Sequence, residues 1–153
     1  MISFSEHSIP QEMFRNGRPI DSIFSPDEEL YIRFDRTDGK NVDPGCIRAP
    51  VQSVNRSKYS KAEWVVLANY PKFLNWGYGS FKVCDVPESI TSEYGITHFI
   101  KVEHDPLDDN YSHSELKAYK NGELVKRKND AIRLKYRVIL SQRIIILRMP
   151  EIL

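Results

Sequence analysis

Apolar and aromatic residues occupy every second position in several short stretches of the chain. This alternation is typical of strands that bury one face, and turn residues separate the stretches. The pattern predicts strands near 30–35, 80–84, 96–103, 114–120 and 143–148. The dipeptide Asn121-Gly122 follows the fourth of them and favours a tight turn.

Other segments carry the spacing of helices. Ser60 precedes Glu63 by three residues, as in a capping box, and apolar residues follow. Residues 129–140 are ambiguous, because their alternation also fits a strand, but the cap at Asn129-Asp130 favours a helix. We expect helices near 60–69, 87–94 and 129–140.

These elements predict a single α+β domain over residues 1–153, with a small antiparallel or mixed sheet and two to four short helices. The length of 153 residues is typical of one domain. Residues 1–24 lack a clear pattern, and we expect them to form an irregular segment packed on the rest.

Composition indicates an ordinary globular chain, with 41% hydrophobic and 28% charged residues. No apolar run approaches the roughly 20 residues that span a bilayer, and the first residues do not resemble a secretory signal. Cys46 and Cys84 lie far apart, which argues against a disulfide framework or a cysteine-based zinc site. We therefore expect a cytoplasmic protein that has no membrane partner.

Charge is distributed unevenly, although the net charge is only +1. Ten basic and two acidic residues lie between Lys117 and Arg148, so this third carries +8 and the remainder −7. Such asymmetry indicates either an anionic partner or two parts that neutralise one another in the fold.

The segment from His104 to Glu115 is the richest in candidate acid–base residues. It holds two of the four histidines and four carboxylates. His113 and Glu115 are two positions apart, so on a strand they share a face and can share a proton. His104 and Asp105 would support them or bind a metal, but the spacing matches no known metal motif, so no metal is assigned. The alternative is a solvated acidic loop.

A second segment, Ser53 to Ser60, gathers hydroxyls, an amide and two cations before the expected helix. Backbone N–H groups at a helix N-terminus favour anions, and an arginine can bind phosphate in bidentate fashion. The alternative is a simple turn and cap, because the chain lacks a glycine-rich phosphate loop. The predicted ligand-binding residues are Ser53, Asn55, Arg56, Arg33 on the first strand, and Asn110 in the acidic segment. The stretch 70–78 mixes aromatic residues with a lysine, which can stack bases but is more often part of a core.

Two functions follow as hypotheses. In the first, the chain binds or processes a phosphate-bearing ligand, a nucleotide or RNA, with His113 as the acid–base group, His104 in support and Glu115 orienting or polarising His113. In the second, the chain is a non-catalytic adaptor whose basic C-terminal third meets an acidic protein partner or nucleic acid. The sequence leaves open whether the chain is an enzyme, and it indicates no particular cofactor.

Overall fold

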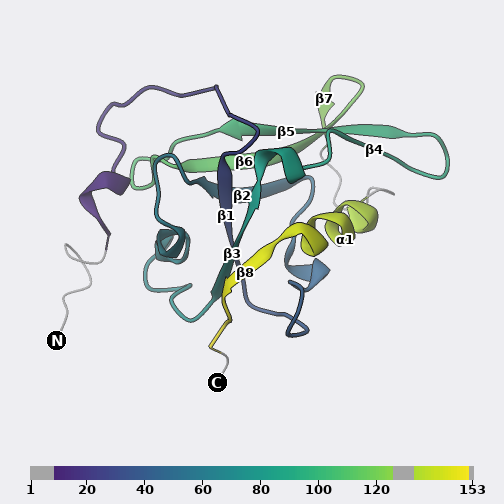
Figure 1. The fold of residues 1–153 in the computed structure, drawn as a ribbon. Helices are drawn as coiled ribbons and strands as arrows, with labels where there is room; N and C mark the ends of the chain where they lie inside the picture. Colours follow the sequence, from purple (N-terminus) through teal and green to yellow (C-terminus); the bar gives the residue numbers. More distant parts are fainter. Residues whose placement is uncertain (1–8, 126–132, 152–153) are drawn as a thin grey trace.

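A computed structural model of the chain describes residues 9–125 and 133–151. In these residues eight antiparallel strands form one curled sheet (Figure 1). The strand order is β4-β5-β6-β2-β1-β3-β8, and the short β7 pairs with β6. The strands are β1 (Glu29–Phe34), β2 (Val51–Arg56), β3 (Gly77–Lys82), β4 (Ser89–Thr91), β5 (Thr97–His104), β6 (His113–Lys120), β7 (Glu123–Leu124) and β8 (Ile145–Arg148).

The predicted α+β class is wrong, because the described residues are mostly sheet and contain one α-helix, α1 (Arg133–Arg143). The remaining helical pieces are single 3-10 segments: η1 (Gln11–Met13), η2 (Pro44–Cys46), η3 (Ala62–Leu67) and η4 (Val83–Asp85).

Two expected helices fail for local reasons. The capping box at Ser60 does not form: its hydroxyl donates to the carbonyl of Lys61, and Lys61 itself precedes the 3-10 segment η3 without a side-chain cap. Residues 87–94 contain the strand β4 instead, which pairs with β5 across a turn that has Gly95 at φ +81°. The glycine expected to end a helix therefore closes a hairpin.

The five predicted strands are confirmed as β1, β3, β5, β6 and β8, with shifted ends. The tight turn at Asn121-Gly122 is also confirmed, since both residues have positive φ values between β6 and β7. The helix preferred for 129–140 is confirmed from Arg133 onward; its predicted start lies outside the described residues. Sequence reasoning missed the short strands β4 and β7 and the longer β2, in which Gln52, Ser53, Asn55 and Arg56 interrupt the apolar alternation.

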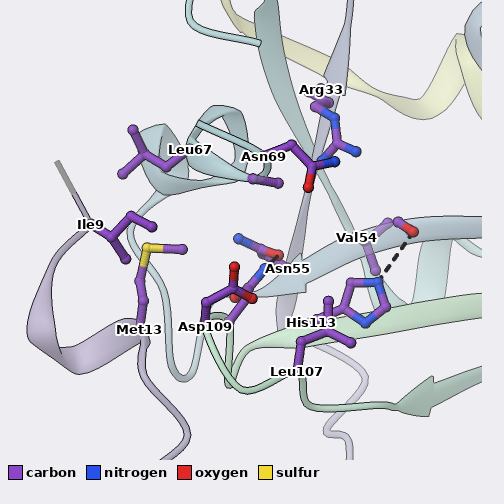
Figure 2. Close-up of a pocket in the computed structure, with 13 residues that line it drawn as sticks. Ile9, Met13, Arg33, Val54, Asn55, Leu67, Asn69, Leu107, Asp109 and His113 are labelled. Carbon is purple, nitrogen blue, oxygen red and sulfur yellow. Dashed lines mark hydrogen bonds between the residues drawn. The ribbon is translucent and has the colours of Figure 1, made fainter. Parts of the chain in front are cut away.

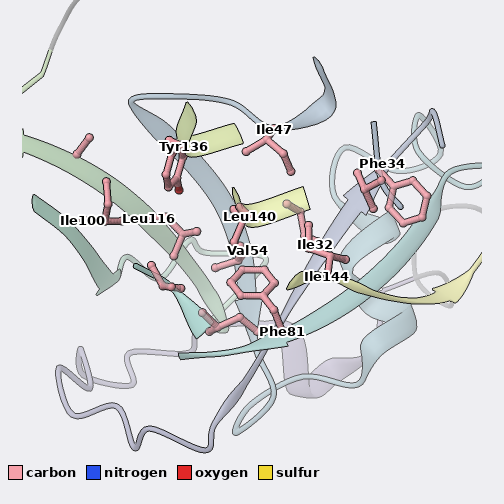
Figure 3. Close-up of a cluster of buried hydrophobic side chains, with 14 of the residues drawn as sticks. Ile32, Phe34, Ile47, Val54, Phe81, Ile100, Leu116, Tyr136, Leu140 and Ile144 are labelled. Carbon is pink, nitrogen blue, oxygen red and sulfur yellow. The ribbon is translucent and has the colours of Figure 1, made fainter. Parts of the chain in front are cut away.

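The sheet has a different covering on each face. On one face α1 contributes Tyr136 and Leu140, and Ile144 follows it; these side chains pack on apolar residues of the central strands (Figure 3). That core includes Leu30, Ile32, Phe34, Val54, Phe81, Ile100 and Leu116. No described helix has the length and apolar character needed to cross a bilayer.

On the opposite face η3 and the segment after it form a second, smaller cluster. Val65, Val66 and Phe73 are buried there and pack against Tyr31 and Tyr78 of the sheet. Because side chains alternate along β1, the same strand that buries Ile32 under α1 directs Arg33 to this second face.

Candidate functional site

A cleft opens on this second face where β1 and β2 separate. The two strands pair at only two positions, Leu30 with Arg56 and Tyr31 with Asn55, although each is six residues long. Two adjoining cavities, of about 180 Å³ and about 360 Å³, lie there. Arg33, Ser53 and Asn69 line both of them, so we treat the two cavities as one cleft.

The larger cavity is cationic. Asp35 is the one carboxylate among its lining residues, and it lies 3.8 Å from a guanidinium nitrogen of Arg36 and accepts a hydrogen bond from the thiol of Cys46. Four cations line the same cavity: Arg33, Arg36, Arg48 and Lys72. An anion in this cavity would therefore meet an excess of positive charge.

Arg33 connects the two cavities and is half-buried. Its guanidinium lies 4.1 Å above the ring of Phe73 and donates a hydrogen bond of 3.3 Å to the carbonyl of Val65. Burial and, secondarily, the charge of Arg48 lower the pKa of Arg33, but an arginine remains protonated at neutral pH. Within the described part of the chain no carboxylate lies within ion-pair distance of Arg33, so its charge is available to a ligand.

His113 lines the smaller cavity and is held in one tautomer. Its Nδ1 lies 2.7 Å from the backbone oxygen of Asp105, which can only accept, so Nδ1 donates. In the neutral ring Nε2 then carries a lone pair, and it lies 3.2 Å from the hydroxyl of Ser53 (the dashed line in Figure 2). The pairing of β6 with β2, which places Ser53 opposite Glu115, brings His113 and Ser53 together.

Two buried asparagines form the wall beside His113. The side-chain amide of Asn110 donates to Oδ1 of Asn55 at 2.8 Å, and Oδ1 of Asn110 accepts from the hydroxyl of Ser112 at 2.6 Å. Both asparagines line the smaller cavity. Their mutual hydrogen bond fixes the 105–112 loop to β2, so they shape the cavity as well as face it.

Glu115 lies next to this arrangement but lines neither cavity. Burial raises the pKa of its carboxyl group, and so does a hydrogen bond with the carboxyl of Asp105. Its other close partner is Lys117, at 3.7 Å. Glu115 therefore contacts the residue that holds His113, rather than the cleft.

Arg56 does not belong to the cleft. Its neighbour Asn55 points into the smaller cavity, and alternation directs Arg56 to the other face of β2, where it is fully buried. It forms a bidentate pair with Glu28, with both distances 2.8 Å, and donates to the carbonyls of Asp21 and Ile23. Its charge is thus already neutralised within the fold.

His104 is also placed elsewhere, beneath the chain that crosses at residues 18–24. Its Nδ1 accepts from the backbone N–H of Asp21 at 2.8 Å, so its Nε2 donates to the carbonyl of Tyr111 at 2.6 Å. Burial lowers the pKa of this histidine. No group of three His, Cys, Asp or Glu residues in the described ranges could hold a metal ion.

The structure thus brings together five of the predicted site residues and separates the others. Arg33, Ser53, Asn55, Asn110 and His113 line the cleft; His104, Arg56 and Glu115 do not. Sequence reasoning missed Arg48, Asn69 and Lys72. Lys72 belongs to the aromatic stretch 70–78, whose mixture of cations and rings was a usable signal, whereas nothing in the local pattern around Arg48 marks it.

Comparison of the chain with protein-family models, with curated proteins and with solved structures finds no match.

Proposed function

We propose that the chain binds a phosphate-bearing ligand, a nucleotide or RNA, in the cleft between β1 and β2. The observation that carries this proposal is the convergence of four cations on one cavity that has a single lining carboxylate. Guanidinium groups match phosphate oxygens in geometry and in charge, so Arg33, Arg36 and Arg48 are suited to this ligand.

The size and lining of the cleft favour a nucleotide over a free phosphate ion. The larger cavity, about 360 Å³, is within the range of small-molecule sites. Phe73 and Trp76 contribute aromatic surface to it and contact one another edge to face, with ring centroids 4.7 Å apart. A base could pack against the partly exposed ring of Trp76 while its phosphate contacts the arginines.

His113 gives the site a group that can move a proton. Its Nε2 contacts the hydroxyl of Ser53, which lines both cavities, and an imidazole in this position can take a proton from that hydroxyl. This feature favours processing of the ligand over simple retention.

No specific observation favours the adaptor function. Three cations of the basic C-terminal third donate to backbone carbonyls inside the fold: Lys135 to Thr91, Arg143 to Asp85, and Arg148 to Leu74 and Trp76. These contacts fasten α1 and β8 to the rest of the chain. These three cations of the C-terminal third therefore have a structural role.

A binding measurement tests the proposal. Fluorescence anisotropy would follow a short, fluorescein-labelled single-stranded RNA, with AMP as the competitor, at several salt concentrations between roughly 50 and 200 mM. The variants are Arg48→Ala and Lys72→Ala; Lys40→Ala is the matched control, because it removes one exposed positive charge from a turn that lines neither cavity.

We expect each cleft variant to weaken binding by about ten-fold or more and to lower the salt slope by about one. The control should bind like the wild type. If all three variants bind alike, or if AMP fails to compete, the cleft is not a nucleotide site.

A further inference from the structure

We propose that Ser53 is a nucleophile that His113 activates, and that it accepts a phosphoryl group from a phosphoanhydride such as a nucleoside triphosphate. This inference rests on the proposed function, because it takes the cationic cleft as the binding site. It adds the reacting atom and the class of substrate.

The tautomer of His113 is the one that a general base needs. The backbone oxygen of Asp105 fixes the proton on Nδ1, which leaves the lone pair of Nε2 directed at the hydroxyl of Ser53, 3.2 Å away. A serine becomes nucleophilic when an adjacent base is oriented by a third group in this way. Because the orienting group is a backbone carbonyl, the arrangement does not depend on the protonation state of Asp105.

Ser53 is also placed where a substrate can reach it. It is half-buried on β2, a central strand with β6 on one side and β1 on the other, so its position is well defined. It lines both cavities, with His113 in the smaller one and the cations Arg36, Arg48 and Lys72 in the larger one. The hydroxyl therefore lies between its base and the proposed phosphate site.

The transfer conserves atoms and charge in two steps. The oxygen of Ser53 attacks phosphorus while its proton passes to Nε2 of His113, and the bond from phosphorus to the bridging oxygen breaks. In the second step water attacks phosphorus from the side opposite Ser53, the bond from phosphorus to the oxygen of Ser53 breaks, and the protonated His113 returns its proton from Nε2 to that oxygen, while both protons of the water stay on the released phosphate. Phosphate and free Ser53 are the products.

The direction of the leaving group restricts the substrate class. In phosphoryl transfer the attacking and leaving oxygens are roughly in line, so the leaving oxygen departs away from Ser53 and His113 cannot protonate it. A leaving phosphate departs as a stable anion and needs no proton. The arginines and the lysine of the larger cavity are placed to neutralise it.

The charge that develops on His113 also has a partner. Oδ2 of Asp105 lies 3.9 Å from Nδ1, so the imidazolium formed in the first step faces a carboxyl group as well as a carbonyl. This contact stabilises the protonated ring without competing for Nε2.

Labelling with a fluorescent alkyl fluorophosphonate tests the nucleophile directly, since an activated serine displaces fluoride from phosphorus. Mass spectrometry of the peptides should place the label on Ser53. Labelling should vanish in Ser53→Ala and be slower by about 100-fold or more in His113→Gln. Ser89→Ala, which removes an exposed serine from the edge strand β4, is the matched control and should label like the wild type.

The substrate class is tested with ATP. We expect release of phosphate by the wild type and by Ser89→Ala, and none by Ser53→Ala. Circular dichroism would establish that the variants fold. If Ser53→Ala does not fold, both assays would be repeated with Ser53→Cys, which preserves the size of the side chain.

The inference would be overturned if Ser53 were labelled equally fast in His113→Gln, or if only other residues were labelled. It would also be overturned if ATP hydrolysis survived the loss of Ser53, or if the wild type did not hydrolyse ATP. Failure of the proposed function looks different, because RNA would then bind alike to the wild type, Arg48→Ala and Lys72→Ala, whether or not Ser53 is labelled. An RNA or AMP that binds through Arg48 and Lys72 while Ser53 stays unlabelled leaves the cleft as a binding site and removes only the nucleophile.

Discussion

Arg33 and Arg56 show that the face of the sheet on which an arginine lies determines its role. Both were expected to hold phosphate. Arg33 lines the cleft and contacts an aromatic ring and one carbonyl, whereas Arg56 is enclosed by Glu28 and the chain around Asp21. The first arginine has charge to offer a ligand, and the second is required by the fold.

Arg56→Lys should therefore destabilise the protein without a specific effect on the cleft. A lysine retains the charge but cannot reproduce the bidentate contact with Glu28 or the two bonds to carbonyls. We expect the free energy of unfolding in urea to fall by about 1–3 kcal/mol, because buried carbonyl acceptors lose their hydrogen-bond partner. An unchanged unfolding midpoint would show that the network contributes little.

His104 predicts a pH dependence of stability. Burial lowers its pKa in the folded state below the usual 6.5, so below that pH the unfolded chain binds a proton that the folded chain excludes. The free energy of unfolding should fall as the pH drops through about 6.5, by up to about 1.4 kcal/mol per pH unit, and should not depend on this residue above it.

The matched variants are His104→Gln, which cannot titrate, and His113→Gln, which leaves His104 in place. Urea unfolding between about pH 7.5 and 5.5 should show a smaller slope in His104→Gln alone. Equal slopes in the wild type and in His104→Gln would mean that another group is responsible.

At the scale of elements, the strand β2 shows why local periodicity does not identify every strand. Its inner residue Val54 belongs to the core, but Gln52, Ser53, Asn55 and Arg56 face a cavity or a buried network, so the strand has no apolar stripe. Local periodicity identifies strands whose polar side is solvated, as in β5 and β6. It cannot identify a strand whose polar side chains are buried by tertiary contacts, and the cleft is built on such a strand.

The same limit applies to the site residues. The hairpin of β5 and β6 was predictable, and with it the position of His113. Its contact with Ser53 depends on the pairing of β6 with β2, a long-range contact that no spacing along the chain encodes. Arg48 and Lys72 reach the cleft from separate loops for the same reason.

The contact of β3 with the edge strand β8 depends on Gly79. A Cβ atom there would lie 2.6 Å from the carbonyl oxygen of Ile145 and 2.7 Å from a methyl carbon of Ile144. Because the first of these atoms is backbone, β8 would have to move. Gly79→Ala should lower the free energy of unfolding by about 1–3 kcal/mol in urea. A variant as stable as the wild type would show that β8 shifts freely.

At the scale of the molecule, the two faces of the sheet have different roles. One face holds the core beneath α1 (Figure 3), and the other holds the cleft beside the segment that follows η3 (Figure 2). A substitution on the α1 side should change stability, and a substitution in the cleft should change binding. The uneven charge of the sequence fits this division, since basic residues near the C-terminus fasten α1 and β8 in place.

The occupancy of the cleft can be observed by following the backbone amide NMR signals of the protein during a titration with AMP. We predict that the signals that move lie on β1, β2 and the segments at 45–48, 69–76 and 109–113, and that Arg48→Ala weakens their response. Shifts confined to α1 and β8, or no shifts at all, would contradict the assignment of this cleft as a site for phosphate-bearing ligands.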